Sequence, residues 1–113
     1  MDFAVKIDNG TAVVKTNVEK LNASNAPGLK AELVLINKGS VNNIVIDMTK
    51  TKYCDSSGLS AILVANRMCK DTNGQFVLCG LQENVEKLIE IAQLDRVLTI
   101  TSNESKAIAA IAK

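Results

Sequence analysis

The hydrophobic residues of this chain fall in short runs near its start and at helical spacing further on. Two runs rich in β-prone residues, 3–7 and 11–15, flank Asp8-Asn9-Gly10. An Asn-Gly pair between such runs predicts a hairpin, because both turn positions need a positive φ. The chain is therefore expected to begin with two antiparallel strands.

A helix is predicted after the hairpin, beyond a loop expected over residues 17–24. Its apolar positions recur at helical spacing, at Leu29, Leu33 and Ile36. Asn25 is the expected N-cap, and Pro27 suits the first turn, where its missing N–H costs nothing. Gly39 is the expected stop at the C-terminal end.

The rest of the chain alternates strands with helices. Nearly continuous apolar runs at 44–48 and 76–79 are typical of central strands covered on both faces, and 97–100 is expected as a short last strand. Helical spacing returns at residues 57–71, at 85–92 and in a last helix through Ile111. The order ββαβαβαβα predicts an α/β fold with four helices and a mixed, mostly parallel β-sheet, in which the hairpin is the antiparallel pair.

Composition narrows the class of protein. A chain of 113 residues with 47% hydrophobic residues and one proline is expected to form a single domain over 1–113. Aromatic residues make up 3% and the net charge is +1, so little favours direct nucleic-acid binding. The apolar runs are too short to span a membrane, and the first residues do not resemble a signal peptide. A cytoplasmic location without membrane insertion is expected.

The sequence lacks several residue patterns that catalysis and metal binding commonly use. The chain has no histidine, which removes His-based triads, His-based metal sites and histidine phosphorelay. It also lacks a glycine-rich nucleotide-binding loop. Cys54, Cys69 and Cys79 show no C-x-x-C spacing and are expected to be reduced, buried thiols. We therefore expect neither an enzyme nor a metal or other cofactor.

One polar motif, Asp55-Ser56-Ser57-Gly58, separates a predicted strand from a long apolar helix. Unpaired N–H groups and the helix dipole favour an added anion at such a helix start, so a serine there is suited to accept a phosphate. The alternative is a simple N-cap, in which Asp55 or Ser56 accepts backbone N–H bonds. Both Ser56 and Ser57 lie near the helix start, so this local chemistry does not choose between them as phosphoacceptor.

The helix that follows carries two leucines outside its main apolar face. The core side consists of Ala61, Ile62, Ala65, Met68 and Cys69. Leu59 and Leu63 lie one turn apart among the polar positions, beside Ser56. Such a pair indicates a partner-binding surface. Packing at the edge of the core is the alternative.

The segment NIVIDMTKTKYCDSSG, residues 43–58, resembles the signature of STAS domains and, more narrowly, of bacterial anti-sigma factor antagonists. The similarity continues through 75–79 and 84–94, and with the hairpin it covers nearly the whole chain. It implies that Ser56 is the phosphoacceptor. It also implies that the unphosphorylated protein binds an anti-sigma factor that is a serine kinase, and so releases the sigma factor.

The same resemblance implies how the switch is reset. Phosphorylation by the kinase with ATP weakens the complex, and a serine phosphatase later removes the phosphate. Nothing in the sequence demands more than a monomer, so a monomer is expected. The alternative within the same fold is a scaffold STAS domain of a lipid-transport or stress-signalling complex, in which the serines serve only as helix caps.

The chain departs from the family pattern before its first helix. Many antagonists carry Gly-x-Leu-Asp there, whereas this chain reads Val18-Glu19-Lys20-Leu21-Asn22. Asn22 stands at the aspartate position and lacks its charge, so partner specificity is expected to differ. A partner contact through Asn22 and Ser24 is one interpretation, and capping within the loop is the other.

Overall fold

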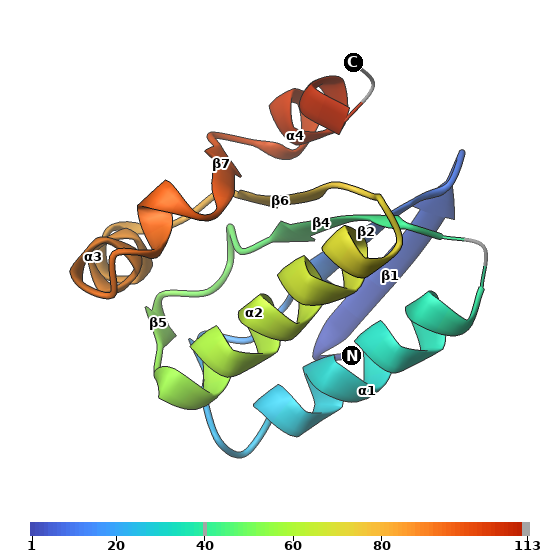
Figure 1. Cartoon of the computed structure of the whole chain (residues 1–113). Coiled ribbons are helices and arrows are strands. Elements are labelled where there is room, and N and C mark those ends of the chain that lie inside the picture. The colour runs from blue at the N-terminus through green and yellow to red at the C-terminus, as the bar shows by residue number, and fades with distance from the viewer. Residues whose placement is uncertain (40, 112–113) are drawn as a thin grey trace.

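The computed structural model describes residues 1–39 and 41–111, and a five-stranded sheet forms its centre (Figure 1). The strands lie in the order β1 (Phe3–Asp8), β2 (Thr11–Thr16), β4 (Asn43–Asp47), β6 (Phe76–Cys79) and β7 (Thr99–Thr101). β1 and β2 pair antiparallel, and every later pair is parallel. Asn9 and Gly10 both have positive φ, as the hairpin prediction requires. The α/β fold class with a mixed, mostly parallel sheet is confirmed.

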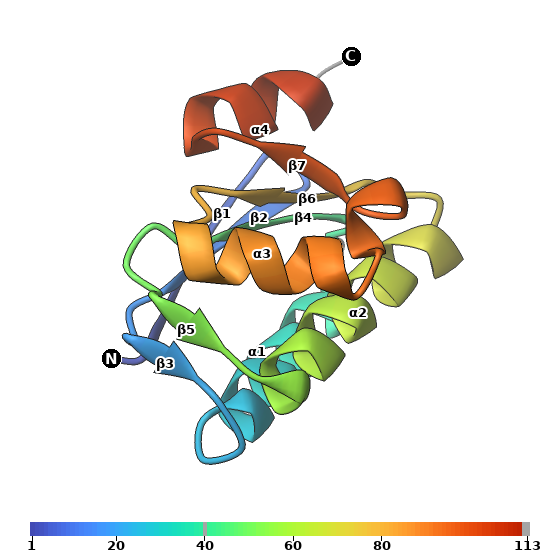
Figure 2. The same ribbon diagram turned by 90° about the vertical axis from the view of Figure 1, so that its left-hand side faces the viewer.

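Four helices pack around the sheet within the described part of the chain. They are α1 (Ala26–Lys38), α2 (Ser56–Asp71), α3 (Glu83–Ile91) and α4 (Glu104–Ile111). Figure 2 shows α1 and α2 side by side on one face, with α4 on the opposite face. A short 3-10 helix, η1 (Leu94–Arg96), links α3 to β7. No described helix is both long and apolar enough to cross a bilayer.

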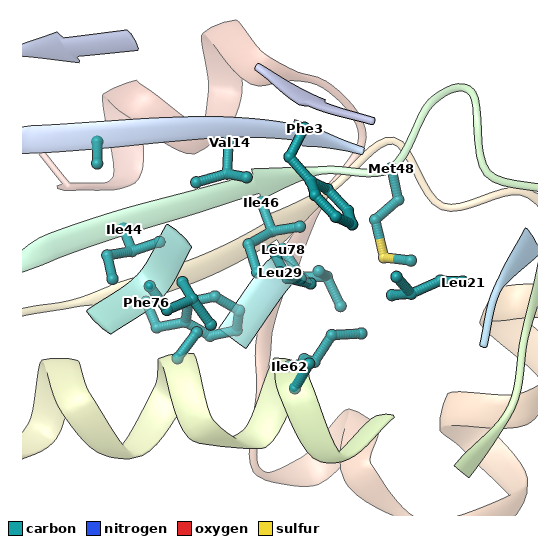
Figure 3. Close-up of a cluster of buried hydrophobic side chains, with 14 of the residues drawn as sticks. Phe3, Val14, Leu21, Leu29, Ile44, Ile46, Met48, Ile62, Phe76 and Leu78 are labelled. Atoms are coloured by element: carbon teal, nitrogen blue, oxygen red, sulfur yellow. The ribbon is translucent and has the colours of Figure 1, made fainter. Parts of the chain in front are cut away.

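The main core lies between the sheet and the α1–α2 layer (Figure 3). Ile46 and Leu78 of the central strands meet Leu29 of α1 and Ile62 of α2, and all four are fully buried. A smaller cluster beneath α4 includes Val45, so β4 is covered on both faces as its apolar run predicts. The predicted core positions of α1, Leu29 included, are all buried.

Two short strands, β3 (Lys20–Leu21) and β5 (Tyr53–Cys54), lie in segments for which the sequence predicts neither a helix nor a strand. The predicted loop over 17–24 is wrong at β3, which pairs in parallel with β5 in a separate two-stranded sheet. Strands of two residues are too short to show a hydrophobic period. This small sheet lies directly before α2, at the end of the molecule where the serine motif is found (Figure 2).

The boundary of the last strand also differs from the prediction. The strand expected at 97–100 is shifted to β7, because the residues just before it form η1 and a bend. Val97 is exposed, whereas Leu98 is buried in the main core. An apolar run alone does not distinguish a strand from a tight helical turn that buries one residue.

Candidate functional site

The Asp55–Gly58 turn is held at its base by the small β3–β5 sheet. Leu21 pairs with Cys54 in register, and the Leu21 carbonyl accepts a hydrogen bond from the Asp55 N–H at 3.2 Å. The loop that follows β3 and the first turn of α2 therefore lie side by side. This pairing brings the Asn22 region to the serine motif, although the two are more than thirty residues apart in the sequence.

Asp55 is the N-cap of α2. Its Oδ1 accepts the N–H of Ser57 at 2.9 Å and the N–H of Gly58 at 3.1 Å. Of the two residues expected to cap the helix, Asp55 does so, and its carboxylate also faces the positive end of the helix dipole. These two donors are therefore occupied. The expectation that they stand free for an added anion is wrong.

The two serines differ in their access to solvent. Ser56, the first residue of α2, is exposed, whereas Ser57 is half-buried. Ser56 also borders two hollows of the surface: one of about 320 Å³ between α1 and α2, and one of about 510 Å³ between α2 and the α3–η1 segment. Ser57 borders only the first of these two. The position of Ser56 is the more open to an enzyme that would modify it.

Leu59 and Leu63 line the larger hollow, which we call the α2–α3 groove. Its other lining residues are Ser56, Ser60, Val64, Arg67, Ala92 and Leu94. Both leucines are half-buried and pack against the main core, which agrees with packing at the edge of the core, and their role in binding a partner stays a prediction. They form the apolar wall of a groove that begins at Ser56.

Asn22 and Ser24 bond within their own loop. The Asn22 Oδ1 accepts the Ser24 N–H at 3.0 Å and the Ser24 hydroxyl at 2.7 Å. Asn25 stands at the predicted N-cap of α1, but its side chain does not bond into that helix. Its amide instead donates to the Lys20 carbonyl at 2.8 Å. The geometry agrees with loop capping, and a partner contact through Asn22 and Ser24 stays a prediction.

Gly58 lies where two segments approach closely. A Cβ built on it would be 2.5 Å from the Cys54 Sγ and 2.9 Å from the Leu21 carbonyl oxygen. Any side chain would push α2 away from the β3–β5 sheet. The glycine of the motif is therefore a packing requirement, and the sequence offers no sign of it, because the contacts come from two other segments.

Lys30 is a residue of the site that the sequence does not single out. Its Nζ donates a hydrogen bond to the Ser60 Oγ at 3.1 Å across the α1–α2 hollow. Ser60 follows Ser56 by one helical turn, so the two serines share a face of α2. Only the packing of α1 against α2 places this ammonium group near the motif.

The three cysteines carry free thiols, two buried and one half-buried. Burial raises the pKa of the Cys54 thiol to about 11, and the neighbouring Asp55 carboxylate adds to the rise. Burial likewise raises the pKa of Cys69 to about 11 and that of Cys79 to about 12. Thiols of this kind are protonated at neutral pH and are poor nucleophiles. Cys54 therefore contributes packing to the motif.

Comparison with known proteins identifies the family. Residues 2–107 match the family model of the STAS domain. The chain belongs to the STAS domain family. The serine turn, the capped start of α2 and the adjacent groove are thus features of a STAS domain, and the resemblance seen in residues 43–58 is confirmed.

Several relatives of the chain are named as anti-sigma factor antagonists. The STAS domain is 30% identical over 91 residues to BtrV of Bordetella bronchiseptica, which is named as an anti-sigma factor antagonist; the match covers 80% of this chain and 78% of BtrV. It is 29% identical over 89 residues to the anti-sigma-B factor antagonist of Listeria monocytogenes, with 77% and 76% covered. The crystal structure of TM1081 from Thermotoga maritima, named likewise, superposes with a TM-score of 0.89 at 27% identity, covering 98% of this chain and 95% of that one.

Proposed function

We propose that this STAS domain is an anti-sigma factor antagonist switched by phosphorylation at Ser56. Its unphosphorylated form binds an anti-sigma factor that is also a serine kinase, and binding releases the sigma factor. The kinase then transfers the γ-phosphoryl group of ATP to the Ser56 hydroxyl oxygen, with ADP and the hydroxyl proton as the other products. The complex weakens, and a serine phosphatase restores the free hydroxyl.

The observation that carries this proposal is the placement of Ser56. It is exposed at the first position of a capped helix and stands at the mouth of an apolar groove. A kinase needs an accessible hydroxyl, and a docking partner needs apolar surface beside it. The relatives named as anti-sigma factor antagonists support the class of partner. The domain itself acts as a cytoplasmic monomer that binds protein, without direct contact to nucleic acid.

The physical chemistry of the switch follows from where the phosphate would be. A phosphate adds about −1.5 to −2 charges at pH 7. Because Ser56 is exposed and no regular hydrogen bond of α2 depends on its hydroxyl, the added group leaves the fold intact. A partner that closes over Ser56 must instead remove a dianion from water, which costs several kcal/mol if the charge is left unpaired. Phosphorylation therefore acts on the complex.

The test is direct phosphorylation by the cognate anti-sigma kinase with ATP. Wild type and Ser57→Ala are expected to gain one phosphate each, mapped by fragmentation mass spectrometry to Ser56, and Ser56→Ala is expected to gain none. Ser57→Ala is the matched control, since it removes the neighbouring hydroxyl. A kinase that binds the folded protein but adds no phosphate would favour the scaffold interpretation, although the serines would not be helix caps there, because Asp55 is the residue that caps α2.

The α2–α3 groove gives a second prediction. Leu59→Glu with Leu63→Glu places two carboxylates on its apolar wall and is expected to weaken kinase binding about tenfold or more. Val34→Glu with Leu35→Glu is the charge-matched control, because these α1 residues are 45% and 64% exposed and line neither hollow beside Ser56. Affinity is measured by calorimetry, and circular dichroism verifies that both variants are folded. Unchanged affinity in a folded groove variant would place the interface elsewhere.

A further inference from the structure

We propose that Lys30 binds the phosphate group on Ser56 and holds it in the hollow between α1 and α2. This inference rests on the function proposed above, since it concerns the phosphorylated state. It assigns a role to a residue of α1 that lies outside the serine motif. Lys30 is thus a positioning residue for the modification.

The geometry places the lysine ammonium within reach of the modified serine. The Lys30 Nζ is 3.1 Å from the Ser60 Oγ, and Ser60 stands four residues after Ser56. Residues at this spacing on a helix have Cβ atoms about 5–6 Å apart. The ammonium group already points at the face of α2 that carries Ser56. A phosphate there meets it through a change of side-chain torsions only.

The hollow itself offers one positive charge and no negative one. It is lined by Ala23, Ala26, Pro27, Lys30, Ser56, Ser57 and Ser60 and is an open hollow of about 320 Å³, which is ample for a phosphate group. Neither α1 nor α2 has an acidic residue in its first turn. Within residues 1–39 and 41–111, Lys30 takes part in no ion pair. Its charge is therefore available to an anion.

The backbone at the start of α2 offers fewer free N–H donors to a phosphate than a helix N-terminus usually does. The N–H groups of Ser57 and Gly58 already donate to Asp55, whose carboxylate lies next to Ser56 and repels an added dianion. Lys30 is the charged group in the hollow that offsets this repulsion. Hydrogen bonds between an ammonium group and a phosphate are of the stronger, charge-assisted kind.

Lys30 is also prepared for the role by its packing. Its side chain is half-buried, and its end is bonded to the Ser60 hydroxyl, so it is already directed toward α2 and loses less side-chain freedom on binding a phosphate than a fully exposed lysine would. The phosphate then lies along the α1–α2 seam at a defined place. A partner approaching the α2–α3 groove meets a fixed dianion beside the groove mouth.

The experiment uses the full chain with phosphoserine installed at position 56, so that no kinase is required. Joining a fragment that ends at Tyr53 to a synthetic one that begins at Cys54 gives this protein by native chemical ligation. Phosphorus NMR then follows the second ionisation of the phosphate with pH. A nearby cation favours the dianion, so the titration midpoint is expected about half a pH unit higher in Lys30→Met than in wild type.

Three further variants separate this contact from general charge effects. Lys30→Arg keeps a cation and is expected to titrate near wild type, and Lys30→Gln repeats the loss of charge with a polar side chain. Lys38→Met removes the same charge from the exposed last turn of α1, about 12 Å along the helix, and is expected to leave the midpoint unchanged. Equal midpoints in wild type and folded Lys30→Met, or an equal shift in Lys38→Met, overturn the proposal.

The outcome is independent of the kinase experiment. If the shift appears but no kinase modifies Ser56, the phosphate site stands and the switch function fails. If the kinase modifies Ser56 but the titration midpoint is the same in wild type and Lys30→Met, the proposed function stands and the role of Lys30 fails.

Discussion

Ser56→Asp is expected to bind the anti-sigma kinase at least tenfold more weakly than wild type, a loss of about 1.4 kcal/mol. The aspartate puts a permanent charge at the mouth of the α2–α3 groove, where a docked partner would have to desolvate it. The fold does not oppose the change, because an acidic residue in the first turn of a helix is favoured by the dipole. The effect therefore appears in affinity, and thermal stability stays close to that of wild type.

Ser56→Asn is the matched control for this experiment, because it has the shape of aspartate without its charge. Ser56→Ala removes the hydroxyl altogether. Both are expected to bind within a few-fold of wild type when measured by calorimetry at one ionic strength. If asparagine weakens binding as much as aspartate, bulk at position 56 matters rather than charge. If all four proteins bind alike, Ser56 lies outside the interface and phosphorylation does not act there.

Gly58→Ala is expected to destabilise the protein by about 1–3 kcal/mol. Helix propensity by itself predicts the opposite sign, since alanine is better than glycine in a helix by up to about 1 kcal/mol. The tertiary contacts reverse the sign. A Cβ at Gly58 would lie 2.5 Å from the Cys54 Sγ and 2.9 Å from the Leu21 carbonyl oxygen, and the second neighbour is backbone in a paired strand.

Gly28→Ala is the control, because Gly28 holds the same third position of α1 that Gly58 holds in α2. Its Cβ would meet the Phe3 ring at 3.4 Å, an ordinary contact, so alanine there is expected to be neutral or to stabilise by up to about 1 kcal/mol. Urea unfolding measures both variants. A stable Gly58→Ala protein would mean that the β3–β5 sheet yields readily.

Cys54→Ala tests which neighbour of Gly58 dominates. Removing the Sγ eliminates the nearest contact and leaves two atoms of Leu21, its carbonyl oxygen and its Cγ. Gly58→Ala is therefore expected to cost less in the Cys54→Ala background, with a coupling of about 0.5 kcal/mol or more. Additive effects would assign the whole cost to the contacts with Leu21.

Much of this STAS domain follows from local patterns in its sequence. The Asn9-Gly10 turn, the apolar runs of β4 and β6 and the helical spacing of α1 each report an element from residues close together in the chain. Asp55 as the cap of α2 belongs to the same class, because an N-cap bonds to donors two and three residues ahead. Such features depend on neighbours that the sequence itself displays.

The remaining features depend on contacts between distant segments. β3 and β5 have two residues each and form only because they pair with each other, so neither has a period to detect. Leu59 and Leu63 lie on the polar side of an isolated helix, but the α3–η1 segment packs beside α2 and turns them into a groove wall.

The functional site likewise combines features that local sequence determines with features that only tertiary packing determines. The sequence determined the hairpin, the order of the main strands and helices, the capped helix start and the serine motif, because each is written in residues within a turn or two of one another. Tertiary structure alone decided that Ser56 is the more open serine, that position 58 has no room for a side chain and that Lys30 reaches Ser60 across 30 residues of chain. Those facts arise from the packing of α1, α2 and the small sheet, and no local pattern encodes the distance between two packed elements.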